Sequence, residues 1–165
     1  MTLILKDIPD EDLQAFYEMV ADPTLSINTG SIPYPIDLEW ARERLAQRRR
    51  EEKEGTRADR GVYDSDTLVG MAGWFRNEND LIELGYAIHK DHRGKGYATK
   101  AAAMVLDMLR DAGCDEPVYA QYFKDNVASG RVLEKLGFTA ERATESVSAA
   151  RGGSAPAWLM RLDEL

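Results

Sequence analysis

The sequence is poor in cysteine, in histidine and in long apolar runs. Its single cysteine, Cys114, cannot form a disulfide within the chain, and two histidines, His89 and His92, leave few soft metal ligands. No apolar run approaches the roughly 20 residues that a membrane-spanning helix needs. The start, MTLILKDIPDED, soon becomes acidic, unlike a secretory signal peptide. We therefore expect a cytoplasmic protein that has no metal site and does not bind a membrane.

Positive charge is also scarce, because 21 Lys and Arg residues face 29 Asp and Glu residues, for a formal net charge of −8. Nucleic acids and anionic membranes select basic surfaces, so this balance argues against a general partner of either kind. The length of 165 residues suits one ordinary domain. No internal repeat or linker divides the sequence. We expect one domain over residues 1–165.

The first part of the sequence predicts two helices. Apolar residues recur at helical spacing after Pro9, and Asp22-Pro23 ends this pattern. The segment 24–36 is rich in turn formers but carries apolar side chains, which suggests a loop that lies against another part of the chain. Asp37 can cap a second helix, and the charged run RRREEKEG at its end predicts a solvated surface.

From residue 60 the pattern changes to that of strands. RGVYDS, TLVGMAGWFR and LIELGYAIHK, separated by turns, predict a three-stranded meander. Both alternating sets of the second segment are apolar or small, which is typical of a central strand covered on both faces. A helix with a wide apolar face follows and ends at Gly113.

The remaining sequence predicts a strand at PVYAQYF, a helix at DNVASGRVLEKLGF, and two strands near 138–147 and 156–163. A crossover from 81–90 to 117–123 should make these two strands parallel. The predicted fold class is α/β with a mixed, mostly antiparallel sheet in the order ααβββαβαββ, a central parallel strand pair and helices on both faces.

A basic segment, HKDHRGKGYATK, stands out in this acidic chain. It holds Lys90, Arg93, Lys95 and Lys100 against one acid, Asp91, at a strand–loop–helix junction. Its glycines allow close approach of the backbone, and the free amides at the start of the next helix favour an anion. The segment predicts a phosphate site, but it matches neither the P-loop pattern nor the complete dinucleotide fingerprint.

Three motifs in order resemble the GCN5-related N-acetyltransferase superfamily. HRGKGYAT is similar to its pyrophosphate loop, ELGYAI to its fourth strand, and NVASGRVLEKLGF to a helix of its ribosomal-protein N-terminal acetyltransferase subgroup. The resemblance covers almost the whole chain. It implies a single N-acetyltransferase domain with acetyl-CoA as co-substrate and no metal.

The resemblance also implies the residues that hold acetyl-CoA. The pyrophosphate would lie on the amides of residues 94–99, and the pantetheine arm would run beside strand 81–90 and use its backbone groups. The implied cofactor-binding residues are Ala87, Ile88, Arg93, Gly94, Lys95, Gly96, Tyr97, Ala98, Thr99 and Asn126. Asn126 and Ser129 would lie near the pantetheine and thioester; helix capping is the alternative for both. Gly130 within the same helix indicates close approach of a bulky group.

Attack by an amine requires its neutral form, so a general base is useful. The candidate is Glu83, with the small residues Gly85 and Ala87 on the same face; the alternative is a glutamate paired with a nearby Arg or Lys. Many members of the superfamily have a tyrosine as general acid where this sequence has Leu133. Ser129 or a water is the substitute we expect.

The resemblance implies transfer of acetyl to a primary amine by direct attack in a ternary complex. A peptide or protein α-amine is the expected acceptor, while polyamines, amino acids and aminoglycosides remain open, and an acidic chain tolerates a cationic acceptor. A non-catalytic acyl-CoA-binding module is the other alternative. The acceptor side should be formed by the loop 24–36, the second helix and a flexible loop near 148–156. Monomer and homodimer are both compatible with the sequence.

Overall fold

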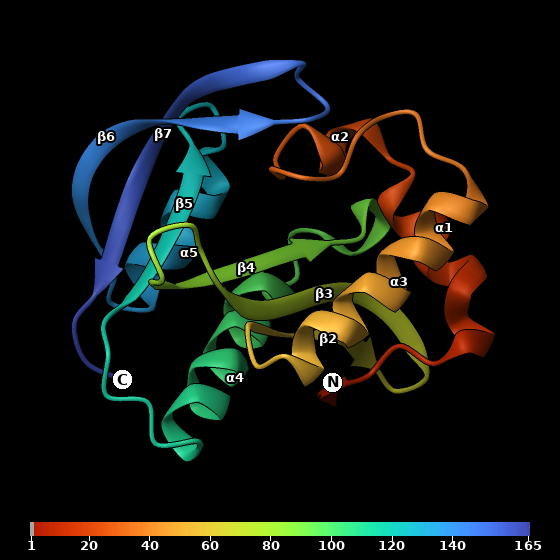
Figure 1. Ribbon diagram of the computed structural model, residues 1–165, viewed down its shortest axis with the longest axis horizontal. Coiled ribbons are helices and arrows are strands. Elements are labelled where there is room, and N and C mark those ends of the chain that lie inside the picture. Colours follow the sequence, from red (N-terminus) through yellow and green to blue (C-terminus); the bar gives the residue numbers. More distant parts are fainter. Residues whose placement is uncertain (1) are drawn as a thin grey trace.

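Seven strands form one sheet with the order β1-β2-β3-β4-β5-β7-β6 in the computed structural model, which describes residues 2–165 (Figure 1). The strands are β1 Leu3–Lys6, β2 Arg57–Asp64, β3 Thr67–Arg76, β4 Ile82–Ile88, β5 Val118–Phe123, β6 Thr139–Ser148 and β7 Gly153–Leu162. The helices are α1 Leu13–Val20, α2 Pro23–Ser26, α3 Leu38–Lys53, α4 Tyr97–Asp111 and α5 Val127–Lys135, with short 3-10 turns at Asp10–Asp12 and Lys90–His92. No helix within residues 2–165 has the length and apolar character needed to cross a membrane.

The central parallel pair is the feature that shapes the site. All other neighbouring strands are antiparallel, which confirms the mixed sheet, and β4 and β5 run parallel as predicted. The register joins β4 and β5 only at Ile82–Val118 and Glu83–Tyr119. Beyond these two positions the strands diverge, as Figure 1 shows, and the sheet opens between them.

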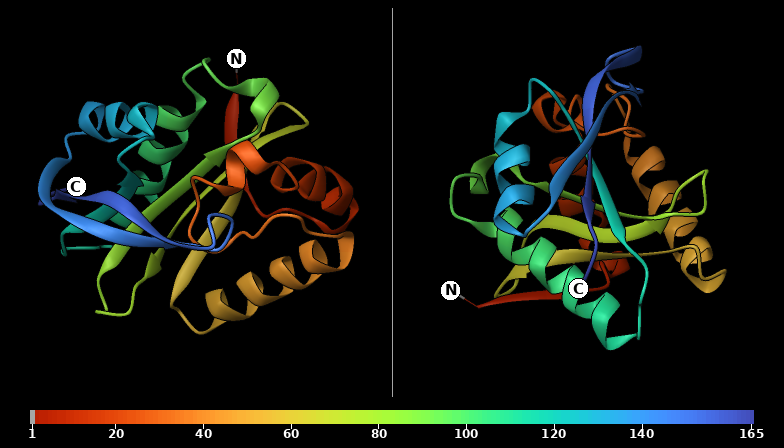
Figure 2. Two further views of the ribbon diagram at one scale, coloured as in Figure 1. Left: turned by 90° about the horizontal axis from the view of Figure 1, so that it is seen from above. Right: turned by 90° about the vertical axis from the view of Figure 1, so that its left-hand side faces the viewer.

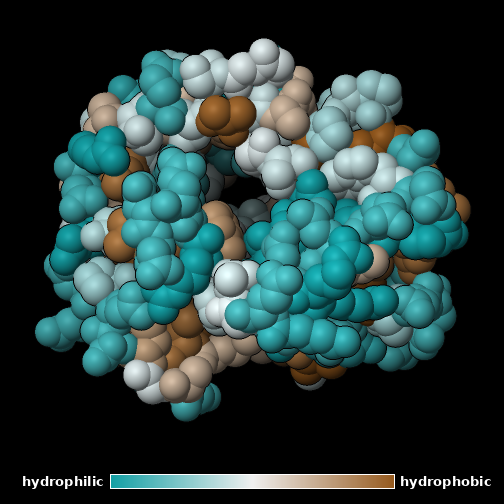
Figure 3. Space-filling view, viewed as in Figure 1, coloured by the Kyte–Doolittle hydropathy of each residue, from teal (hydrophilic) through white to brown (hydrophobic). Residues whose placement is uncertain are grey.

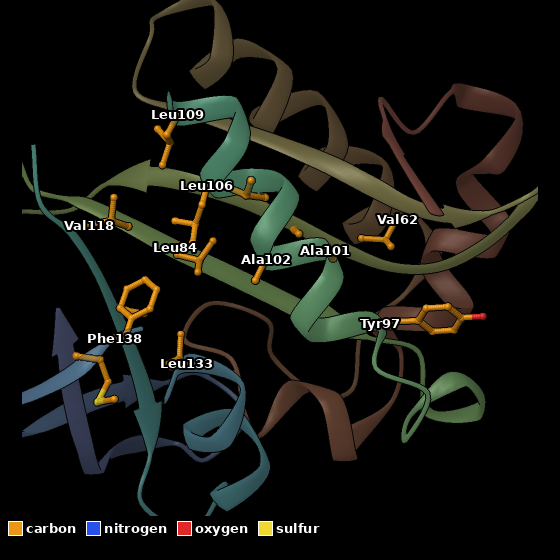
Figure 4. Packing of buried hydrophobic residues seen from close by; sticks show 14 of the residues in the cluster. Val62, Leu84, Tyr97, Ala101, Ala102, Leu106, Leu109, Val118, Leu133 and Phe138 are labelled. Carbon is orange, nitrogen blue, oxygen red and sulfur yellow. The ribbon is translucent and has the colours of Figure 1, made fainter. Parts of the chain in front are cut away.

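Helices cover both faces of the sheet (Figure 2), and each face has its own apolar core. The α4 face is the larger, and Figure 4 shows how α4 packs on the strands through side chains such as Leu106 and Leu109. The other face is closed by α1 and α3, with Phe16, Met19 and Ala41 buried. These cores follow from the apolar faces of α1 and α4, which remove apolar surface from water.

The structure adds elements that the sequence pattern did not predict. Leu3–Lys6 forms an edge strand against β2, and Pro23–Ser26 forms one helical turn capped by Asp22, whose side chain accepts from Thr24 N. β7 begins at Gly153, so the segment near 148–156 is the tip of a β-hairpin and not a flexible loop. Ser148 is fully buried there, and Ala149 N donates to Gly30 O at 2.9 Å. These contacts between distant segments order the tip.

The charged end of α3 also differs from the prediction of a solvated run. The side chains of Arg48 and Glu51 are only 19% and 24% exposed. Both reach β2, where Glu51 pairs with Arg57 at 2.9 Å and Arg48 lies 3.8 Å from Asp59. This end of α3 has no apolar face, and it therefore contacts the sheet through ion pairs.

Candidate active site

The opening between β4 and β5 is part of a cavity of about 1310 Å³. Its lining comes from both faces of the sheet: Arg44 and Phe75 belong to the α3 side, whereas Gly96 and Asn126 belong to the α4 and α5 side. Figure 3 shows the hollow on the α3 side, between the β6–β7 hairpin and the segment that contains α2. Two ligands that enter from opposite faces can therefore meet at β4.

The hairpin tip bridges the top of this opening. Arg151 Nε donates to Ile27 O at 2.6 Å, and the same guanidinium pairs with Asp125 at 2.8 Å. Together with the bond from Ala149 N to Gly30 O, these contacts join β6–β7 to the segment after α2. The cavity is thus enclosed above as well as at its sides, which makes it a passage.

The basic loop ends in a helix terminus without a cap. Gly94 and Gly96 have φ of +77° and +80°, a region that residues with a Cβ rarely adopt. No side chain caps α4, and its first intrahelical bond runs from Lys100 N to Gly96 O. The amides of residues 97–99 are therefore free to bind an anion, and the helix dipole favours negative charge there.

The side chains of this loop have unequal roles. Lys95 is exposed and forms no ion pair in the part of the chain that the structure describes. Arg93 is already engaged: its guanidinium lies 3.3 Å from a carboxylate oxygen of the buried Asp22, and its Nε donates to Ile88 O at 3.1 Å. Tyr97 is buried, and its hydroxyl donates to Asp64. Lys95 thus offers a free charge, whereas Arg93 and Tyr97 fix the loop to the body of the protein.

The β3–β4 ladder determines which backbone groups of β4 face the opening. At one end of the ladder His89 N donates to Val69 O, and at the other end Asn77 N donates to Leu81 O. The register between these two bonds is unbroken, so odd-numbered residues of β4 form the hydrogen bonds to β3. Even-numbered residues, among them Tyr86 and Ile88, therefore direct their backbone groups toward the opening, where the Ile88 carbonyl is already used by Arg93 Nε. The backbone of Ala87 is used by β3, which differs from the expectation that it serves a bound ligand; its side chain still lines the cavity.

Glu83 lies on the cavity wall and is only 7% exposed. Asn77 Nδ2 donates to one of its oxygens at 3.0 Å, and Gln121 Nε2 donates to the other at 3.2 Å. Burial raises the pKa of the Glu83 carboxyl, and the two amide donors offset part of this rise. No Arg or Lys within residues 2–165 pairs with it, so the alternative of an ion-paired glutamate does not apply. A buried carboxyl with a raised pKa suits a general base.

Asn77 holds Glu83 in a fixed orientation. The side-chain oxygen of Asn77 accepts from the amides of Asn79 and Leu81 at 2.9 and 3.1 Å. Its nitrogen must therefore point the other way, toward Glu83. This role could not be predicted from the sequence, because asparagine in NEND is an ordinary turn former. The contact between Gln121 and Glu83 could not be predicted from the sequence either, since only the tertiary fold brings β5 to β4.

The start of α5 lines the opposite side of the cavity. Asn126 is at the N-cap position, yet its side chain makes no capping bond, so the capping alternative does not hold for it. The Ser129 hydroxyl lies 2.8 Å from that of Tyr86, whose pKa burial raises to about 12. A Cβ at Gly130 would lie 2.7 Å from the Tyr122 ring, which identifies the bulky neighbour that the glycine admits.

Leu133 has no access to the cavity. It is fully buried and packs in the α4 core near Phe138, as Figure 4 shows. The cavity side of α5 consists instead of Asn126, Ala128, Ser129, Val132 and Lys135. A proton donor at the position of Leu133 is thus absent, while Ser129 and Tyr86 lie in the cavity wall. Tyr86 was not singled out in the sequence, because its neighbour on α5 is 43 residues away.

Within residues 2–165 no three His, Cys, Asp or Glu residues lie together as a metal site would require. The groups that the structure does bring together are an uncapped helix terminus, an open strand edge and a buried carboxyl. The first two fit a long phosphate-containing ligand that bonds to a strand edge, and the carboxyl lies beside the opening.

Comparison with known proteins identifies the family. The family described as acetyltransferase (GNAT) domain matches residues 2–139. An uncharacterized N-acetyltransferase of Bacillus subtilis, YokL, is 30% identical over 84% of this chain and 77% of its own. Another from the same organism, YjdG, is 36% identical, but the match covers 46% of each chain, so this chain spans about half the length of that relative.

The fold comparison agrees. The structure of the ribosomal alpha-N-protein acetyltransferase RimL in complex with coenzyme A superposes with a TM-score of 0.86 at 16% identity, over 98% of this chain and 94% of that one. At this identity the likeness shows the fold alone. The family match covers far more than half of the chain, and the chain therefore belongs to the acetyltransferase (GNAT) domain family and is an acetyl-CoA-dependent N-acetyltransferase.

Proposed function

We propose that this enzyme acetylates the α-amine at the N-terminus of a peptide or protein, by direct attack on acetyl-CoA in a ternary complex. The observation that carries the proposal is the position of Glu83: this buried carboxyl lines the same cavity as the uncapped terminus of α4. One ligand can therefore bind along the loop and β4 while another presents an amine to the carboxyl.

The donor binds through backbone groups and one free cation. The pyrophosphate lies on the amides of Gly94 to Thr99, Ala98 included, and Lys95 adds charge. The pantetheine arm follows β4, where the backbone groups of Tyr86 and the amide of Ile88 face the opening, and it passes Asn126 at the start of α5. Arg93 holds the loop in place through Asp22. The thioester then reaches the part of the opening that Glu83 faces.

Glu83 accepts the proton that the attacking amine loses. The nitrogen lone pair attacks the thioester carbonyl, the carbon–sulfur bond breaks, and the thiolate of coenzyme A leaves. A carboxyl with a raised pKa binds this proton more readily than an exposed one. An α-amine, with a pKa of about 7.7–8.0, needs less help than a lysine side chain near 10.4. This difference favours a peptide terminus as acceptor.

Ser129 donates a hydrogen bond to the departing thiolate, which leaves as the thiolate of coenzyme A or takes a proton from water. Its hydroxyl lines the cavity and is held by Tyr86 at 2.8 Å. Because Tyr86 is buried and its pKa is raised to about 12, its phenol stays protonated at neutral pH. It can therefore keep a hydrogen bond on Ser129 while Ser129 donates to sulfur.

The shape of the passage also favours a chain end. The bridge made by Arg151 and Ala149 encloses the opening above, so an acceptor must enter end first. An extended peptide terminus fits such a passage, and so does a small amine. A polyamine, an amino acid or an aminoglycoside is therefore the second candidate. The retained base argues against a non-catalytic acyl-CoA-binding module.

Release of free thiol from acetyl-CoA tests the proposal. Peptides with a free N-terminus are compared with the same peptides blocked at that end, and with spermidine, free amino acids and an aminoglycoside. Turnover that needs the free terminus supports the proposal. Turnover only with the small amines would assign the second candidate, and absence of turnover with every amine would leave only acyl-CoA binding.

A further inference from the structure

One row of residues crosses the sheet on the α3 face and includes the base. Arg57, Phe75, Glu83 and Tyr119 lie directly opposite one another on β2, β3, β4 and β5. Cross-strand neighbours point to the same face, and all four residues line the cavity. Neighbouring strands lie about 4.8 Å apart, so the Cα atoms of Arg57 and Glu83 are separated by about 10 Å.

The cavity surface along this row has room for an extended acceptor. The Arg57 guanidinium lies 5.0 Å from the centre of the Phe75 ring, and it is held by Glu51 and Asp59. Gly85 follows Glu83 on the same face, and a Cβ there would meet only Phe75, at 3.8 Å. An acceptor whose amine faces Glu83 can thus extend over Phe75 toward α3.

Arg44 of α3 is not in ion-pair contact with any carboxylate of the described residues. Its guanidinium donates to Ser31 O at 2.7 Å and to Ser31 Oγ at 3.1 Å, and it stacks on the Trp40 ring at 4.4 Å. Burial, together with repulsion from Arg48 and Arg57, lowers the pKa of Arg44 to about 10, although attraction to Asp59 and Glu51 offsets part of this change. An anion bound here would relieve this unfavourable environment.

Two arginines of the cavity wall have no carboxylate partner within residues 2–165. Away from the α4 loop and α5, six arginines line the cavity: Arg44, Arg48, Arg57, Arg60, Arg76 and Arg142. Four of them are ion-paired, with Glu51, Asp59, Glu52 and Glu116 among their partners. Arg44 and Arg142 remain, and their charge can pair with a negatively charged ligand, whereas the overall charge led us to expect an acceptor side that tolerates a cationic one.

We propose that the acceptor is an acidic peptide terminus, in which the α-amine faces Glu83 and a carboxylate within the first three residues pairs with Arg44. This inference rests on the proposed function. An extended peptide advances about 3.3 Å per residue, so three residues span the roughly 10 Å from Glu83 to Arg57, and a side chain at the third residue extends from there toward Arg44, which lies close enough to Arg57 for mutual repulsion. A free α-amino acid does not, because its carboxylate is two bonds from its amine.

Three peptides that differ only at the third residue test the inference: Ser-Ala-Glu-Ala, Ser-Ala-Gln-Ala and Ser-Ala-Lys-Ala, each amidated at its C-terminus. We expect kcat/KM to be about 10-fold or more higher for the Glu peptide than for the Gln peptide, and lowest for the Lys peptide. The preference should weaken with added salt, since it depends on charge.

Variants of α3 identify the residue responsible. Arg44→Gln should remove the preference for Glu over Gln, and Arg44→Lys should retain part of it because the charge remains. Arg42→Gln is the matched control: Arg42 lies on the same helix, is exposed and pairs with Glu39. That control should retain the full preference. Thermal unfolding of each variant shows that the fold is intact.

The outcomes separate the inference from the proposed function. Equal kcat/KM for the Glu and Gln peptides, or a preference that survives in folded Arg44→Gln, would overturn the inference while peptide acetylation itself stands. Absence of turnover with every peptide, together with turnover of small amines, would overturn the proposed function and the inference with it.

Discussion

Replacing Glu83 with glutamine removes the proposed base while keeping the shape of its side chain. Asn77 can still donate to the new amide oxygen, since its own orientation is fixed by two backbone amides. Gln121 can rotate its amide to accept from the new nitrogen, because its other partner is the Ser146 hydroxyl, which can donate or accept. Glu83→Gln should therefore fold normally.

The expected loss of kcat is at least about 10²-fold, the lower range for general-base catalysis, or about 2.7 kcal/mol of transition-state stabilisation. An α-amine with a pKa near 8 is about one-tenth neutral at pH 7, and in the variant only this fraction can attack, without help from a base. Its rate should rise with pH up to about 8, and its deficit should shrink there. The wild-type rate should fall as pH drops through the raised pKa of Glu83.

Although Glu83→Gln should lower kcat, it should not lower the stability of the fold. The pKa of Glu83 is higher in the folded than in the unfolded chain, so ionisation of this carboxyl destabilises the fold. The penalty is absent below the unfolded pKa, about 4.3, and grows as pH rises through the folded pKa. Glu83→Gln avoids it, and its Tm at pH 7 should equal or exceed that of the wild type.

Thiol release, Tm and acetyl-CoA affinity are measured together for wild type and Glu83→Gln. Lower kcat with unchanged acetyl-CoA affinity and an undiminished Tm is the expected pattern. Near-wild-type kcat across pH 6–8 in a folded variant would refute the assignment of Glu83 as base. A parallel loss of acetyl-CoA affinity would place the residue in donor binding instead.

Three further substitutions probe the rest of the site. Ser129→Ala should lower kcat about 10-fold or more with acetyl-CoA affinity unchanged, and equal kcat in a thiol-release assay would exclude a hydrogen bond from Ser129 to the leaving thiolate. Gly96→Ala forces a Cβ into a backbone with φ of +80°, so it should lose about 1–2 kcal/mol in stability by denaturant titration and bind acetyl-CoA more weakly; unchanged affinity by calorimetry would contradict the loop assignment. Gly130→Ala places a Cβ 2.7 Å from the Tyr122 ring and should cost about 1–3 kcal/mol of unfolding free energy, whereas a gain in stability would mean that the ring moves freely aside.

The sequence predicted the elements whose signals are local. The β2–β4 meander, the parallel β4–β5 pair and the glycines that start and end α4 follow from hydrophobic period and from positions that need positive φ. The edge strand β1 was missed because four residues carry too little periodicity. The hairpin tip near 148–156 was missed because Gly30 and Ile27, more than 100 residues earlier, order it.

In the candidate site, too, the residues with a local sequence signal were predicted and those that depend on tertiary contacts were not. Glu83 and the loop at Gly94 and Gly96 were predicted from a carboxylate on a strand and from a glycine-rich junction. Asn77 and Arg44 were not, since their importance comes from what they face: Asn77 orients a carboxyl, and Arg44 lies in a cavity without an acidic partner. Such roles depend on tertiary contacts that spacing in the sequence does not encode.

Mass spectrometry of one peptide tests the central claim most directly. The peptide carries a free N-terminus and one internal lysine, and it is incubated with the enzyme and acetyl-CoA, with Glu83→Gln in parallel. The proposed function predicts one acetyl group on N-terminal fragments, an unmodified lysine, and strongly reduced product with the variant. Acetylation of the lysine alone, or an unmodified peptide under conditions in which spermidine is acetylated, would contradict it.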